Sequence, residues 1–187
     1  MRKGSKRQDL KRLGRFEMDA ELLYSKLLAD LQKRCSSSGI DSFELAGLAM
    51  GGAWIAERLA QDLGLARYGV INVAFHRDDY AEKGMTAART AKTMPTHLPF
   101  DVNGAKVILI DDVLFTGRTV RAALNELFDF GRPDRVELMV LADRGKRELP
   151  VSADFVGQYV ELPDEKILAL ERDSNNQFQF QLEDRES

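Results

Sequence analysis

Apolar residues recur at helical spacing in three parts of the chain. Leucines at this spacing predict a first helix from Asp19 to about Arg34, with Asp19 as its N-cap and the Ser-Ser-Ser-Gly segment 36–39 as its end. These leucines are Leu22, Leu23, Leu27, Leu28 and Leu31. Further helices are predicted from about Ala53 to Leu63, ended by Gly64, and from Thr119 to about Phe130.

Between these helices lie short segments that are apolar without polar alternation. They are Phe43–Met50, Gly69–Phe75, Lys106–Ile110, Val136–Ala142 and Asp154–Val160. Continuous apolarity is typical of parallel strands that are buried on both faces. The pattern therefore predicts an α/β fold, in which helices flank a central, mostly parallel sheet.

The long segment Asp78–Pro99 fits neither pattern. A loop of this length within a compact domain is usually a functional lid or a disordered segment. At the start of the chain, residues 1–15 hold seven Lys or Arg and one Asp. We expect 1–17 to be a basic, disordered tail, with a polyanion-binding arm as the alternative, and 18–187 to form a single domain.

Composition excludes several classes of protein. The formal net charge of -3 disfavours a globally basic nucleic-acid binder, although a local basic face remains compatible with it. Cys35 is the only cysteine, so no internal disulfide can form, which fits a cytoplasmic location. The two histidines, His76 and His97, are too few for a histidine metal cluster, and no apolar run reaches the roughly 18 residues of a membrane span.

The segment Val107–Thr119 carries the most specific chemistry. A buried strand delivers Asp111 and Asp112 to its carboxyl end, where open α/β sheets bind their ligands. The turn Thr116–Thr119 then opens a helix, and helix-terminal amides favour an anion such as phosphate. Carboxylates followed by a phosphate turn suit a sugar phosphate. A structural cap or a metal site is the alternative for an isolated acid pair, whereas dinucleotide and P-loop motifs are absent from the sequence.

This segment resembles the phosphoribosyl pyrophosphate (PRPP) motif of type I phosphoribosyltransferases. Its details are similar to the PyrR family, pyrimidine-operon attenuation regulators that are also uracil phosphoribosyltransferases. The resemblance runs from about Asp19 to about Arg172. Its further motifs are His76–Asp79, Phe130–Pro133 and Asp143–Pro150.

The resemblance implies a type I phosphoribosyltransferase fold with a flexible lid, Asp78–Pro99, and a small hood. It implies that Asp111 and Asp112 hold the ribose hydroxyls and that the 5-phosphate turn includes Thr116, Gly117, Arg118 and Thr119. Val113, Leu114 and Phe115 complete the PRPP motif, and Met50, Gly51 and Gly52 would meet the pyrophosphate. Arg77 would act in catalysis, with Lys83, Arg89 and Lys92 as further lid bases. Phe155 would stack on the base and Val156 would offer it backbone groups.

Two departures from relatives affect this expectation. No charged side chain stands in the turn around Met50, so neutralisation of pyrophosphate would depend on Mg²⁺ that arrives with PRPP, on Arg77 and on the lid. Apolar Phe115 stands where purine-specific relatives often carry an acid, which favours a pyrimidine base. We therefore expect conversion of uracil and PRPP to UMP and pyrophosphate. A purine or other base phosphoribosyltransferase is the alternative.

The same resemblance implies binding of a pyrimidine-operon messenger-RNA leader. Arg144, Lys146 and Arg147 are the candidate phosphate contacts. The alternatives are a plain salvage enzyme and an RNA-binding regulator with little catalytic activity. The family also implies a homodimer or a homotetramer.

Overall fold

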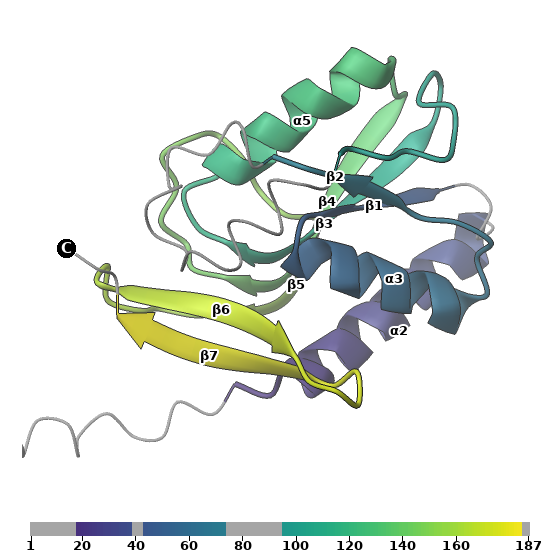
Figure 1. Ribbon diagram of the computed structural model, residues 1–187. Helices are drawn as coiled ribbons and strands as arrows, with labels where there is room; N and C mark the ends of the chain where they lie inside the picture. The colour runs from purple at the N-terminus through teal and green to yellow at the C-terminus, as the bar shows by residue number, and fades with distance from the viewer. Residues whose placement is uncertain (1–17, 39–42, 74–94, 185–187) are drawn as a thin grey trace, which may run out of the picture.

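Five parallel strands form the central sheet in the computed structural model, which describes residues 18–38, 43–73 and 95–184 (Figure 1). The strands are ordered β2-β1-β3-β4-β5. Their bounds are β1 Glu44–Leu48, β2 Gly69–Ile71, β3 Lys106–Leu114, β4 Arg135–Asp143 and β5 Phe155–Tyr159. The predicted tail 1–17 and most of the predicted lid lie outside the described residues.

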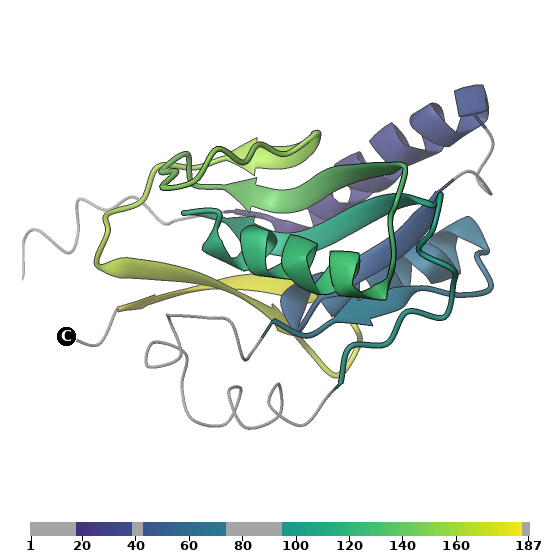
Figure 2. The ribbon, with the colours of Figure 1, turned by 90° about the horizontal axis from the view of Figure 1, so that it is seen from above.

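Helices cover both faces of this sheet (Figures 1 and 2). α2 (Ala20–Ser38) and α3 (Gly51–Leu63) pack on one face, and α5 (Arg118–Phe130) packs on the other. Successive apolar side chains along each strand point to opposite faces and fill the two helix–sheet interfaces. In β3, Ile108 and Ile110 face α2 and α3, whereas Val107 and Leu109 face α5. This two-sided burial explains why the strand sequences show no polar alternation.

Helix ends follow local chemistry that is readable in the sequence. The Asp19 carboxylate accepts a hydrogen bond from the Leu22 amide at 3.0 Å, as expected of an N-cap. Gly64 ends α3 in a left-handed conformation with φ 68°. Most bounds differ from the prediction by a few residues; in particular, α2 continues to Ser38, and β3 continues through both acids to Leu114. The hydroxyls of Ser36 and Ser37 donate to carbonyls of the last turns of α2 itself, whereas β3 continues because it stays paired with β4 as far as Leu114.

An antiparallel hairpin of β6 (Lys166–Arg172) and β7 (Phe178–Asp184) extends beyond the sheet on the side of α2 and α3 (Figure 1). Its turn is tied to α2 by Glu21, whose carboxylate accepts hydrogen bonds from the Arg58 guanidinium and from the Phe178 amide. The Arg58 guanidinium lies over the rings of Tyr24 and Phe178, with its Cζ atom 4.3 and 5.0 Å from the two ring centroids. Burial raises the pKa of Glu21, but the two hydrogen bonds and the positive charge of Arg58 together outweigh it and leave that pKa lowered.

Candidate phosphoribosyl site

The strand order places a topological switch point between β1 and β3. The chain passes from β1 to β2 on one side, and β3 then lies on the other side of β1. Gly47 of β1 pairs with Ile110, so β1 ends level with Asp111 of β3. Open α/β sheets bind ligands in the crevice at such a point, outside the carboxyl ends of the strands. The sequence-predicted acids therefore lie at the edge where this fold forms sites.

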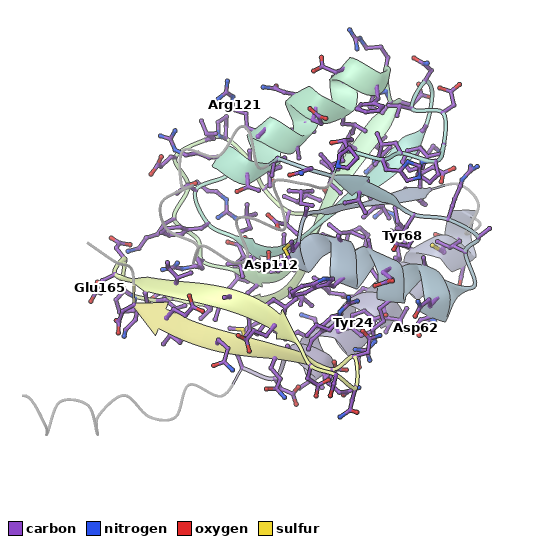
Figure 3. The ribbon with its side chains drawn as sticks, in the orientation of Figure 1. Tyr24, Asp62, Tyr68, Asp112, Arg121 and Glu165 are labelled. Carbon is purple, nitrogen blue, oxygen red and sulfur yellow. The ribbon has the colours of Figure 1, made fainter. Side chains whose placement is uncertain are left out.

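Asp111 and Asp112 are both buried, with 3% and 8% of their surface exposed. Because successive residues of a strand face opposite sides, their side chains point to different faces of the sheet. The Asp111 carboxylate accepts a hydrogen bond from the Asp112 amide at 3.1 Å. Asp112 lies on the α3 side, beside the first turn of that helix (Figure 3).

The turn between β1 and α3 approaches β3 so closely that only glycine fits. A Cβ on Gly51 would lie 2.6 Å from Oδ2 of Asp112, and a Cβ on Gly52 would lie 2.1 Å from the carbonyl oxygen of Ile110. The Ala49–Met50 peptide bond in this turn is cis. The predicted pyrophosphate turn and the predicted sugar acid are thus neighbours in space, although about sixty positions separate them in the sequence.

The turn after β3 has the form that the sequence indicates for a phosphate site. Gly117 adopts φ 91°, a conformation that favours glycine, and α5 begins at Arg118. Thr116 and Thr119 are half-buried, and Gly117 is buried. Arg118 is exposed and pairs with Glu148 at 2.7 Å. Upstream, Leu114 is buried, while Val113 and Phe115 are half-buried.

Phe155 is level with Ile110, the residue before Asp111, because both pair with Met139 of β4. It begins β5, pairs in register with Met139 and is 8% exposed within the core on the α2 side, where Arg34 stacks on its ring. Val156 is half-buried on the other face, and its carbonyl accepts a hydrogen bond from Lys26. The Phe155 side chain thus lies in the core, whereas Val156 is level with Asp111 through their shared partner Val140, and the expected contacts with a base stay a prediction.

The three basic side chains predicted to contact RNA have different environments. Arg144 is 5% exposed, stacks on the Phe115 ring at 4.0 Å and donates to the Pro163 carbonyl. The Arg147 side chain is 21% exposed and pairs with the buried carboxylate of Asp143. Only the Lys146 side chain, 54% exposed and paired with Asp164, lies in solvent. The sequence did not indicate the internal contacts of the two arginines, because most of their partners, apart from the Asp143 carboxylate, are backbone carbonyls and a ring.

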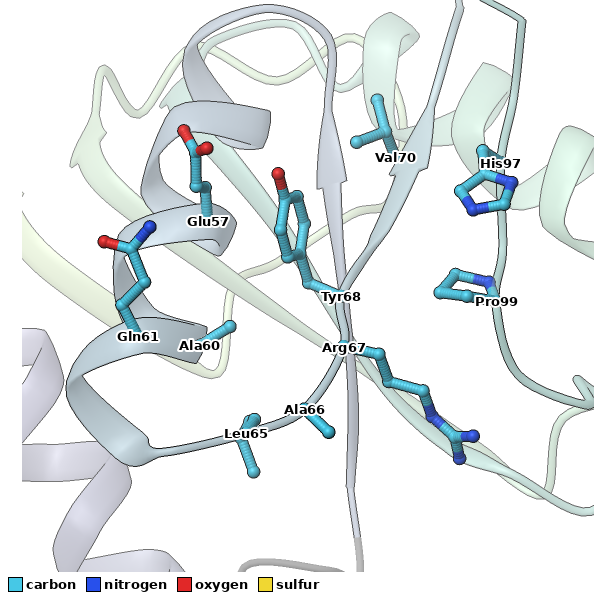
Figure 4. Close-up of a pocket in the computed structure, with 10 residues that line it drawn as sticks. All are labelled: Glu57, Ala60, Gln61, Leu65, Ala66, Arg67, Tyr68, Val70, His97 and Pro99. Carbon is cyan, nitrogen blue, oxygen red and sulfur yellow. The ribbon is translucent and has the colours of Figure 1, made fainter.

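The described part of the chain contains no cluster of three or more His, Cys, Asp or Glu side chains suited to a metal ion. A pocket of about 450 Å³ lies elsewhere, beside the start of β2, between α3 and the segment 97–99 (Figure 4). Burial and the neighbouring Glu57 raise the pKa of Tyr68 in that pocket. None of the residues predicted to bind PRPP lines this pocket.

The predicted catalytic residue Arg77 lies outside the described residues. None of the described helices has the length and apolarity to cross a membrane.

Comparison with known proteins agrees with this geometry. Residues 20–169 match the family model described as phosphoribosyl transferase domain. A purine phosphoribosyltransferase from Pyrococcus horikoshii has the same fold, with a TM-score of 0.53 and 22% identity over 74% of this chain and 83% of that one. A hypoxanthine phosphoribosyltransferase from Trypanosoma cruzi gives a TM-score of 0.53 and 15% identity over 78% of this chain and 75% of that one. The chain is thus a type I phosphoribosyltransferase in fold and family.

Curated relatives narrow the family further. A bifunctional protein PyrR from Ralstonia nicotianae is 51% identical over 157 residues, which cover 84% of this chain and 88% of the relative. Another from Pseudomonas aeruginosa (strain LESB58) is 43% identical over 162 residues, 82% of this chain and 92% of the relative. The chain belongs to the PyrR family. The fold and the family predicted from the sequence are both confirmed.

Proposed function

We propose that this protein transfers the phosphoribosyl group of PRPP to uracil, giving UMP and pyrophosphate. One observation supports this above the others. The buried acid pair of β3 lies between a glycine turn that opens α3 and a phosphate turn that opens α5. A ligand that carries phosphate, vicinal hydroxyls and pyrophosphate matches that order of groups.

The transfer builds positive charge on the ribose and negative charge on the departing pyrophosphate, by analogy with glycosyl transfer. Asp111 and Asp112 would accept hydrogen bonds from the ribose hydroxyls and stabilise the developing positive charge. The first-turn amides of α5 would hold the 5-phosphate, and those of α3 would meet the pyrophosphate. The protein's contribution is therefore positioning and electrostatics.

The proposal includes Mg²⁺ that binds together with PRPP. Mg²⁺ prefers oxygen ligands and usually binds through one or two carboxylates, substrate phosphates and waters. The donor set fits this mode, because Asp111 and Asp112 offer carboxylate oxygens at the edge of the site. When bound, the ion would neutralise charge on the pyrophosphate, for which the turn Met50–Gly52 supplies no cationic side chain.

Uracil is the proposed base because of the ring of Phe115, which adjoins the phosphate turn. This apolar side chain offers no ionic contact to a purine. The Arg144 guanidinium covers one face of the Phe115 ring. The similarity to purine and hypoxanthine enzymes lies below 25% identity and concerns the fold alone.

Turnover of PRPP by an acid-pair variant tests this function. Asp112→Asn should lower turnover tenfold or more and leave the fold intact, because losing a charged acceptor of a bound ligand costs roughly 1.5–3 kcal/mol. Asp129→Asn, an exposed acid on α5, is the matched control and should behave as the unaltered protein. Normal kinetics of Asp112→Asn would remove this carboxylate from the sugar site.

We also propose a second function, binding of a pyrimidine-operon messenger-RNA leader. Relatives at 43–51% identity carry the name bifunctional protein PyrR, which supports two functions in one chain. Of the predicted contacts, Lys146 is the exposed one. Lys146→Ala should lower the salt slope of leader binding by about one unit or slightly less, whereas Lys106→Ala at the other end of the sheet should not. Equal affinity for the leader and an unrelated RNA would refute this function.

The proposal further includes a homodimer or homotetramer, as in the family that the sequence resembles. It also includes a cytoplasmic location, since the single cysteine, Cys35, is buried and unpaired.

A further inference from the structure

The segment after β4, Asp143–Val151, lies against the turn that joins β3 to α5. Three consecutive carbonyls of that turn accept hydrogen bonds from it. Leu114 accepts from the Arg144 amide at 2.9 Å. Phe115 accepts from Nη1 of Arg147 at 2.7 Å. Thr116 accepts from the amides of Glu148 and Leu149, at 3.0 and 3.3 Å.

These bonds fix the direction of the neighbouring amides as well. In a planar trans peptide, the carbonyl of one residue and the N–H of the next point in opposite directions. Carbonyls that face the segment therefore turn the N–H groups of Phe115, Thr116 and Gly117 to the other side. A row of N–H groups that points one way binds anions, whereas a carbonyl turned toward a phosphate would repel it.

Arg147 supplies the only side-chain donor among these bonds, and its guanidinium is fixed on three sides. Nη2 pairs with Oδ2 of Asp143 at 2.5 Å, and Nε donates to the Val151 carbonyl at 2.9 Å. The Arg147 guanidinium thus joins both ends of the segment, Asp143 and Val151, to the carbonyl of Phe115. A lysine keeps the charge but cannot offer three donors in one plane.

We propose that Arg147 is a positioning residue of the 5-phosphate site, which holds the turn Phe115–Gly117 with its amides toward the ligand. It acts through the backbone and does not itself contact the phosphate. The proposal rests on the proposed function, because that function supplies a phosphoribosyl ligand. It also changes the expected behaviour of Arg147 variants: a loss of transfer, not of RNA binding alone, should follow.

Binding of two partial ligands tests this role. Ribose 5-phosphate probes the turn after β3, and magnesium pyrophosphate probes the turn before α3. Arg147→Lys should weaken ribose 5-phosphate binding about tenfold or more and change pyrophosphate binding less than twofold. The matched control is Arg67→Lys, which disrupts a forked ion pair with Glu44 beside β2 and should change neither ligand.

The outcomes separate this inference from the proposed function. Unchanged ribose 5-phosphate binding by Arg147→Lys, or equal weakening of both ligands, would overturn the positioning role alone. Failure of the unaltered protein to bind ribose 5-phosphate, pyrophosphate or PRPP would overturn the proposed function first. Arg147→Ala should weaken ribose 5-phosphate binding further, and the lysine variant provides the test if the alanine variant does not fold.

Discussion

Substitution of Gly52 by alanine perturbs the contact on which the candidate site depends. The new Cβ would lie 2.1 Å from the Ile110 carbonyl oxygen, whereas ordinary contacts begin at 3.4 Å. The difference, 3.4 − 2.1, requires the first turn of α3 to move by about 1.3 Å relative to β3. Both contacting groups are backbone, so no side-chain rotation can relieve the overlap.

The expected cost follows from this displacement. Overpacking of a well-packed core costs about 1–3 kcal/mol. At roughly 2–4 °C per kcal/mol for a chain of this size, Tm should fall by about 2–12 °C. Activity should fall further, because a misplacement of about 1 Å can cost on the order of a hundredfold in rate. Magnesium pyrophosphate binding should weaken, since α3 begins at this turn.

Thermal unfolding and PRPP turnover, measured on the same preparations, check both effects. Gly104→Ala is the control: no atom lies within 4 Å of its new Cβ, and its cost comes only from φ 71°. That cost is about 1–2 kcal/mol, and activity should be retained. If Gly52→Ala keeps the Tm and the turnover of the unaltered protein, the close packing of α3 on β3 is not what forms the site.

Two further predictions concern contacts of α2, one with the hairpin and one with α3. The folded pKa of Glu21 lies below its ordinary value of 4.5, so its stabilising effect is full above that pH and is lost as pH falls through the folded pKa. Glu21→Gln should therefore lower the free energy of unfolding by about 1–3 kcal/mol at pH 7, and the difference should narrow below pH 4.5; an equal difference in acid would contradict this. Tyr24→Phe removes the 2.6 Å hydrogen bond to Asp62 between α2 and α3 (Figure 3) and should cost about 0.5–1.5 kcal/mol in urea unfolding, with turnover unchanged.

The central sheet could be predicted from the sequence because each strand is apolar on both faces. All five of its strands and its three described helices were expected, with bounds that differ by a few residues. The hairpin β6–β7 was not assigned to strands. Phe178, Phe180 and Leu182 alternate with exposed polar residues, which is the pattern of a half-buried strand, so β7 had a readable signal that the criterion of continuous apolarity does not detect.

Of the candidate site, the sequence indicated the acids and both glycine turns, since each is a local motif. It could not give the contacts between distant segments. The bond of Arg147 to the Phe115 carbonyl crosses 32 positions and involves a backbone acceptor, which no residue pattern encodes. Phe155 shows the same limit, because a local resemblance to a base-binding segment does not reveal that its ring is buried in the core.

The choice of base tests the central claim most directly. Release of pyrophosphate from PRPP with Mg²⁺ should be measured with uracil, hypoxanthine, guanine and orotate at matched concentrations, and the nucleotide product should be identified. We expect uracil to be consumed fastest, with UMP as the product. Faster turnover of a purine base would contradict the assignment of uracil, and no turnover with any base would contradict phosphoribosyl transfer itself.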